Sequence, residues 1–180
     1  MSWLIAEDEA DIRNLIATMI QVWGHIPVAY ENGQKVWDWL DTIEQGTAQG
    51  PLPELVLMDI RMPGKKGNEL ANRMRSLPSF KRTPIVLMTA FSLSESERQE
   101  MIHQDGVDQI IHKPLPDFEQ LRLMLHNIVT SKQSALTPEP KAAVPEQPAA
   151  PSAAAPVQNG VPPAPKSNSA ADTVTRQVPE

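Results

Sequence analysis

Short, almost continuous apolar runs alternate along the chain with segments whose apolar residues recur every three or four positions. The continuous runs are 3–6, 55–58, 85–88 and 109–112. Runs of this kind are typical of parallel strands that are buried on both faces. A further run, 26–30, also reads as a strand, and Pro27 within it favours the edge of a sheet.

The segments between these runs carry helical periodicity and recognisable ends. The first helix is expected from about residue 10 to a stop at Gly24, the second between the Asn32-Gly33 turn and the 46–53 loop, and the third over about 67–77. Ser94, with a glutamate three residues later, resembles a capping box that opens a helix ending at Gly106. Asp117 is expected to cap the last helix.

Five strands, each followed by a helix, predict an α/β fold, a doubly wound (βα)5 sandwich. The predicted domain covers residues 1–131. Residues 132–180 hold ten of the chain's 18 prolines and no aromatic residue. Because such a segment has too little apolar surface to offset the entropy of ordering, we expect 132–180 to be a disordered Pro/Ala-rich tail or linker.

Charge and composition exclude several classes of function. Residues 1–131 carry 12 basic and 18 acidic residues, a net charge of −6, without a basic cluster, which argues against direct nucleic-acid binding. The absence of cysteine excludes disulfides and thiolate chemistry. No apolar stretch approaches 18 residues and the early acidic residues do not fit a signal peptide, so we expect a soluble, cytoplasmic protein with no membrane partner.

Chemically useful side chains stand directly after four of the apolar runs. Glu7 and Asp8 follow the first run, and Asp59, Thr89 and Lys113 follow later ones. The carboxyl ends of parallel strands share one edge of an open sheet, where ligands bind. We therefore expect three carboxylates, a hydroxyl and an ammonium group to meet in one pocket, a set that suits a divalent cation together with a phosphoryl group.

Four sequence motifs carry a resemblance to a known family. They are Glu7-Asp8, the run 59–67 (DIRMPGKKG), Thr89-Ala90 and Lys113-Pro114. In this order and spacing the chain resembles a response-regulator receiver domain of two-component phosphorelay signalling, similar to CheY-like proteins. The resemblance covers residues 1–131. It implies a flavodoxin-like parallel sheet in the strand order 2-1-3-4-5.

The resemblance assigns Asp59 as the phosphoacceptor, because a carboxylate can attack a phosphoryl group to give an aspartyl phosphate. Close carboxylates repel one another, by about 4 kcal/mol at 4 Å and an effective dielectric of 20, so they need protons or a cation. Mg²⁺ suits oxygen ligands. By resemblance, Asp8, Asp59 and the backbone carbonyl of Arg61 bind Mg²⁺ directly, and Glu7, where many relatives have Asp, acts through water.

The resemblance also assigns residues that sense the phosphoryl group. The Lys113 ammonium would contact a phosphoryl oxygen, aimed by a cis bond to Pro114, and the Thr89 hydroxyl would hydrogen-bond to the phosphoryl group. Thr89 belongs to the expected switch. Its usual aromatic companion on the fifth strand is replaced here by Ile110, so we expect phosphorylation with an altered switch.

These assignments predict a single-domain response regulator that is not an enzyme beyond self-catalysed phosphotransfer and hydrolysis. A sensor histidine kinase or phosphotransfer protein would phosphorylate it, and a downstream protein that the sequence does not identify would receive the signal. One alternative is a phosphorylation-independent interaction module that uses the same scaffold. Another, a haloacid-dehalogenase-like phosphatase, needs a second aspartate two residues after the nucleophile, where this chain has Arg61.

Overall fold

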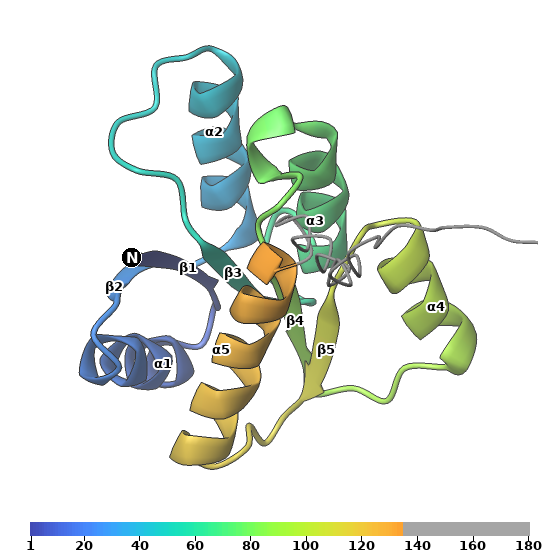
Figure 1. The fold of residues 1–180 in the computed structure, drawn as a ribbon. Helices are drawn as coiled ribbons and strands as arrows, with labels where there is room; N and C mark the ends of the chain where they lie inside the picture. The colour runs from blue at the N-terminus through green and yellow to red at the C-terminus, as the bar shows by residue number, and fades with distance from the viewer. Residues whose placement is uncertain (135–180) are drawn as a thin grey trace, which may run out of the picture. The chain divides into compact units, whose positions relative to one another are not determined.

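The apolar runs form a single parallel sheet with helices on both faces (Figure 1). The computed structural model describes residues 1–134. The strand order is β2-β1-β3-β4-β5, a flavodoxin-like topology that confirms the predicted fold class. The strands are β1 (Ser2–Ala6), β2 (Ile26–Tyr30), β3 (Leu55–Asp59), β4 (Ile85–Thr89) and β5 (Gln109–His112). The helices are α1 (Ala10–Val22), α2 (Gly33–Glu44), α3 (Gly67–Ser76), the short 3₁₀ helix η1 (Pro78–Phe80), α4 (Glu95–His103) and α5 (Phe118–Ser134).

Two apolar cores lie on opposite faces of the sheet. Helices α1 and α5 pack on one face, and α2, α3 and the partly buried side of α4 pack on the other (Figure 1). Every residue of β1, β3 and β4 is buried, whereas β2, with Pro27, forms an edge. The central strands are therefore held rigidly from both sides, and the residues that follow them are fixed in place.

The predicted helix ends are largely confirmed. Gly24 adopts a positive φ of 84° after α1, and the Ser94 side chain accepts a hydrogen bond from the Glu97 backbone N–H in the expected capping box. The Asp117 carboxylate accepts one from the Gln120 N–H at 2.9 Å. Asn32 is the N-cap of α2 and so begins the helix that was expected to follow a turn.

Two helix ends differ from the prediction. Helix α4 ends at His103, before the expected stop at Gly106, because Val107 and the residues before it turn back toward β5. Helix α5 continues through Lys132 to Ser134, beyond the predicted boundary at 131, and Lys132 forms an ion pair with Asp108 at the start of β5. The rest of the predicted disordered tail, from residue 135 onward, lies outside the described residues.

Helix α4 differs from the other α-helices in how it is anchored. None of its nine residues is fully buried, although Met101 packs partly against the core. Within residues 1–134, no helix has both the length and the apolar character needed to cross a membrane.

Candidate functional site

The carboxyl ends of β1, β3 and β5 bring three charged side chains together. The Lys113 Nζ lies 2.8 Å from Asp59 Oδ1 and 2.8 Å from Glu7 Oε2, and it donates a 3.0 Å hydrogen bond to Glu7 Oε1. Glu7 is fully buried and Asp59 is 6% exposed. Residues more than a hundred positions apart in the sequence thus meet at one sheet edge, as the sequence pattern predicted.

Burial and the contacts with Lys113 shift the pKa of Glu7 in opposite directions, and burial and the carboxylates do the same for the pKa of Lys113. Burial raises the pKa of the Glu7 carboxyl above its usual value, and the Asp59 charge adds to that effect, although Lys113 opposes both. For Lys113, burial alone would lower the pKa of the ammonium, but its contacts with Asp59 and Glu7 outweigh burial and raise the pKa above its usual value. The ionised form of the buried carboxylates is therefore unfavourable by itself, and a nearby cation stabilises it.

Backbone contacts hold the two acidic segments in place. The Arg13 guanidinium, one turn into α1, donates to the carbonyl oxygens of Glu7 at 2.7 Å and Asp8 at 3.1 Å. Behind Asp59, a Cβ on Gly67 would lie 2.3 Å from the Asp59 carbonyl oxygen, so only glycine allows α3 to begin this close to β3. The Arg61 N–H donates to Asp59 Oδ2 at 2.8 Å, which orients the carboxylate.

The predicted magnesium ligands are only partly gathered. Asp8 is exposed, and no set of three or more histidine or acidic side chains among residues 1–134 is arranged to hold a metal ion. Nevertheless, two buried carboxylates, Glu7 and Asp59, share one counter-ion among the described residues, the Lys113 ammonium. Buried carboxylate oxygens that carry more negative charge than one ammonium balances fit a hard divalent cation.

Thr89 and Ile110 lie where the sequence placed them, on neighbouring strands. Thr89 is buried at the end of β4, and its hydroxyl oxygen accepts a 3.1 Å hydrogen bond from the Phe91 N–H. Ile110 is buried in β5, pairs in register with Leu87 and packs into the core on the α2–α3 face. The peptide bond from Lys113 to Pro114 is cis, as the resemblance implied.

Sequence reasoning missed two contacts at this edge. One is the pair of hydrogen bonds from Arg13 to the backbone carbonyl oxygens of Glu7 and Asp8, for which the only sequence signal is an arginine early in α1. The other is the stacking of the Arg61 guanidinium on the exposed Phe91 ring, 3.7 Å from its centroid. This pair lies over the loops that follow β3 and β4, at the border of the site.

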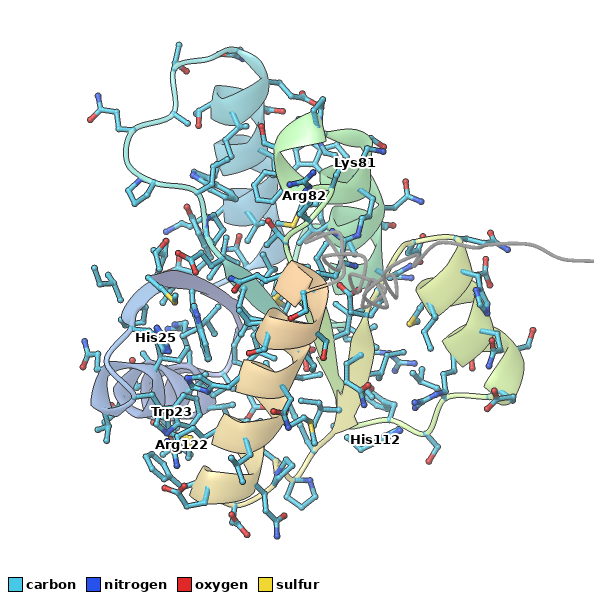
Figure 2. The ribbon with its side chains drawn as sticks, in the orientation of Figure 1. Trp23, His25, Lys81, Arg82, His112 and Arg122 are labelled. Atoms are coloured by element: carbon cyan, nitrogen blue, oxygen red, sulfur yellow. The ribbon has the colours of Figure 1, made fainter. Side chains whose placement is uncertain are left out.

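The basic pairs in the sequence stay separate in the structure. Lys81 and Arg82 are exposed after η1 (Figure 2), beyond the last turn of α3, whereas Lys65 and Lys66 come just before its first turn. Lys113, by contrast, forms ion pairs with Glu7 and Asp59 within the site.

Comparison with known proteins agrees with this geometry. The model of the family described as "Response regulator receiver domain" matches residues 3–126. A protein described as "Uncharacterized 14.6 kDa protein in sodA1 3'region" of Leptolyngbya boryana is 29% identical over 69% of this chain and 87% of that protein. Response regulator Rre1 of Synechocystis is 27% identical over 74% of this chain, which spans about half (54%) of the length of that relative.

Solved structures share the fold. The receiver domain of sensor histidine kinase PA1611 from Pseudomonas aeruginosa PAO1, which has a magnesium ion coordinated in its active site cleft, is 20% identical with a TM-score of 0.58. The match covers 72% of this chain and 97% of that one. At this identity the likeness concerns the arrangement of strands and helices.

Proposed function

This chain belongs to the response regulator receiver domain family, and we propose that it acts as a single-domain response regulator in which Asp59 accepts the phosphoryl group. Receiver domains serve phosphoryl acceptance in two-component signalling and are signalling domains rather than enzymes. The observation that carries the assignment to Asp59 is the contact of Lys113 Nζ with both Asp59 and Glu7 at the sheet edge.

The proposed chemistry uses the Asp59 carboxylate as nucleophile. One of its oxygens forms a bond to phosphorus while the P–N bond to a phosphohistidine breaks, and the electron pair stays on the imidazole nitrogen. The Lys113 ammonium already lies against Asp59, so it can shift to an oxygen of the arriving phosphoryl group. Water later attacks the phosphorus, which regenerates the carboxylate and releases phosphate.

Glu7, Asp8, Asp59 and the Arg61 carbonyl are the proposed holders of Mg²⁺. When bound, the ion neutralises the charge that gathers on the transferring phosphoryl oxygens. Arg13 supports this role because it fixes the backbone of Glu7 and Asp8. The two buried carboxylates of Glu7 and Asp59, which share the single positive charge of Lys113, support a cation at this position.

The conformational switch is proposed to centre on Thr89. In the structure its hydroxyl donates to the Phe91 carbonyl oxygen at 3.3 Å, so donation to a phosphoryl oxygen instead would break that bond and move the loop after β4. Ile110 is buried and has no ring to reorient, so the response should be carried by the β4–α4 loop rather than by β5. The signal would then pass to a downstream protein.

The upstream partner is proposed to be a sensor histidine kinase or a phosphotransfer protein in the cytoplasm. Family membership supports this class of donor, because receiver domains are phosphorylated by such proteins. The segment from residue 135 onward is proposed as a tether or a linker.

A phosphodonor experiment tests the proposal directly. The chain is incubated with acetyl phosphate and Mg²⁺, and intact mass is measured under conditions that preserve acyl phosphates. We expect a gain of one phosphoryl group that is lost in Asp59→Asn and kept in Asp38→Asn, a matched change at an exposed residue of α2. Phosphorylation of the Asp59→Asn variant to the wild-type extent would overturn the assignment.

A second candidate function is a phosphorylation-independent interaction module. Ile110 favours it, because a buried aliphatic residue removes one moving part of the usual switch. Amide NMR shifts of the β4–α4 loop discriminate between the two candidates. They should change on phosphorylation if the chain is a switch and remain fixed if it is a constitutive module.

A further inference from the structure

Two histidines far from the phosphoacceptor site meet side by side. His25 follows the glycine that ends α1 and precedes β2, and His126 lies in α5. Their Nε2 atoms are 3.1 Å apart. Figure 2 shows Trp23, His25 and Arg122 gathered where α1 lies beside α5.

The His126 ring is oriented by its own helix. Its Nδ1 lies 2.8 Å from the Arg122 carbonyl oxygen, an acceptor, so Nδ1 carries the proton and donates it. The Nε2 atom therefore presents its lone pair toward His25. Metal-binding histidines usually donate their second ring N–H to a carbonyl or carboxylate in this way.

The His25 ring is held by aromatic packing. It stacks on the buried Trp3 indole with ring centroids 4.2 Å apart and an interplanar angle of 15°. Trp3 also contacts His126 at a centroid distance of 5.2 Å. Both imidazoles are thus fixed on a common support, and a ligand entering between the two Nε2 atoms would find them already positioned.

The separation of the two nitrogens matches a shared metal ion. Imidazole nitrogens bind Zn²⁺ at about 2.0–2.1 Å, and two nitrogens 3.1 Å apart at that bond length subtend about 98° at the ion. This angle lies between the square-planar and tetrahedral values. Imidazole also suits Zn²⁺ and Cu²⁺, whereas Mg²⁺ prefers oxygen.

We propose that His25 and His126 bind one divalent transition-metal ion of the Zn²⁺ or Cu²⁺ class through their Nε2 atoms. The ion would join the α1–β2 connection to α5, and water would complete its coordination. As the ion binds, both Nε2 lone pairs must face it, so the proton that His25 holds on Nε2 must move to its Nδ1. That buried atom has no acceptor among residues 1–134, so affinity should be lower than at sites with three or four protein ligands.

Calorimetry with Zn²⁺ on the full chain, without a polyhistidine tag and in saturating Mg²⁺, tests the proposal. We expect one equivalent of Zn²⁺ to bind, with affinity reduced at least about tenfold in His25→Gln and in His126→Gln. His103→Gln, a matched change at an exposed histidine of α4, should bind like wild type. Circular dichroism confirms that each variant is folded.

A second measurement needs only the wild-type chain. Cu²⁺ bound at one equivalent should show two imidazole nitrogens in its electron paramagnetic resonance spectrum and should quench tryptophan emission saturably, because Trp3 contacts both rings. Coordination by a single nitrogen would overturn the proposal. So would Zn²⁺ affinity that is unchanged in both pair variants, or that falls equally in His103→Gln; the histidines would then be only a hydrogen-bonded contact.

Discussion

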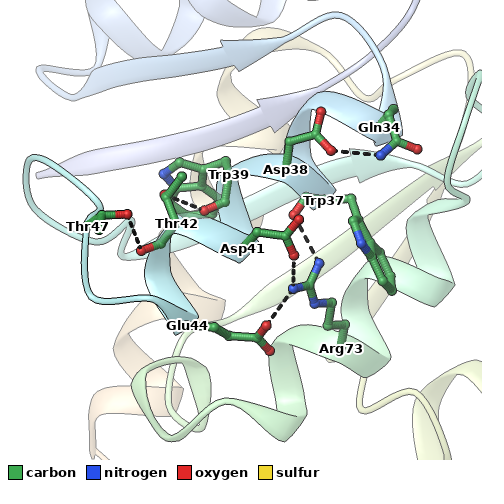
Figure 3. A network of polar contacts seen from close by, with 9 residues as sticks. All are labelled: Gln34, Trp37, Asp38, Trp39, Asp41, Thr42, Glu44, Thr47 and Arg73. Carbon is green, nitrogen blue, oxygen red and sulfur yellow. Dashed lines mark hydrogen bonds and ion pairs between the residues drawn. The ribbon is translucent and has the colours of Figure 1, made fainter.

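Two places within residues 1–134 hold one cation between two carboxylates, and they differ mainly in burial. At the sheet edge, Lys113 lies between Glu7 and Asp59, whose side chains are 0% and 8% exposed. Between α2 and α3, Arg73 lies between Asp41 and Glu44, whose side chains are 44% and 45% exposed (Figure 3). The charges are alike in number and sign, but water screens only the second set.

The surroundings of the two cations explain their different roles. Arg73 also donates to the Trp37 carbonyl oxygen at 3.0 Å and stacks on the Trp37 ring, 4.1 Å from its centroid, so it fastens two helices together. Among the described side chains, the Lys113 ammonium makes hydrogen bonds and ion pairs only with the two carboxylates. A cation with few other partners can transfer its contact to an incoming group, whereas Arg73 is committed to packing.

Removing the buried cation should have the largest effect. Lys113→Met keeps the length of the side chain and leaves two carboxylates without a counter-ion, so we expect a loss of about 3 kcal/mol in the free energy of unfolding at pH 7 without Mg²⁺. Urea denaturation measures it, with Lys66→Met at an exposed position as the control. Lowering the pH toward 5 should reduce the loss, because the pKa of Glu7 is already raised by burial and rises further without Lys113.

Removing Arg73, the cation between the two exposed carboxylates, should lower the free energy of unfolding by less. In Arg73→Met the two carboxylates return to water, so the expected loss is about 1–2 kcal/mol, from weak surface ion pairs, the stacking on Trp37 and one hydrogen bond. The same urea titrations measure it. A loss equal to that of Lys113→Met would show that burial of the carboxylates does not separate the two sites.

Neutralising Glu7 should change how stability depends on pH more than it changes the stability at pH 7. In wild type the raised pKa means that the folded state binds the Glu7 proton more tightly than the unfolded state does. Protonated Glu7 therefore contributes to the free energy of unfolding below about pH 4.5, and this contribution is lost as the pH rises through the folded pKa. Glu7→Gln cannot ionise. We expect its stability to lie within about 1 kcal/mol of wild type at pH 7 and to fall less between pH 4.5 and 7. Thermal unfolding across this range checks it, and parallel profiles would contradict it.

The smallest effect is expected for one exposed carboxylate. Asp41→Asn leaves Arg73 with Glu44, so we expect a change of at most about 0.5 kcal/mol, which 0.5 M salt should reduce further. Chemical denaturation at two salt concentrations measures it. A larger, salt-independent loss would mean that the α2–α3 pair behaves like the buried one.

The sequence predicted the sheet-edge site because strand position determines it. Once 3–6, 55–58 and 109–112 are parallel strands, the residues that follow them must share an edge, whatever the helices do. The sequence did not predict the contacts of Arg13, Arg61 or the His25–His126 pair. Those depend on how far each helix is rotated and how each loop turns, which is decided by packing across the two cores.

Helix boundaries likewise divide into those that local sequence determines and those that tertiary contacts determine. Local signals placed the Ser94 and Asp117 caps correctly, since capping involves residues three apart. The end of α5 was missed because Lys132 is held by Asp108, 24 residues earlier in the chain. The ion pair holds the last turn of the helix against the start of β5. Because a tertiary contact of this kind leaves no periodic signal in the sequence, the sequence placed the end of the helix too early.

Helix α4, which buries none of its residues completely, has a consequence for motion. Opening its nine residues would forfeit little apolar contact, while opening β1 or β3 would break both cores. Amide hydrogens of α4 should therefore exchange with deuterium through local fluctuations, long before those of the central strands. The segment that directly follows Thr89 and its loop is therefore the α-helix whose order can be altered at the least energetic cost.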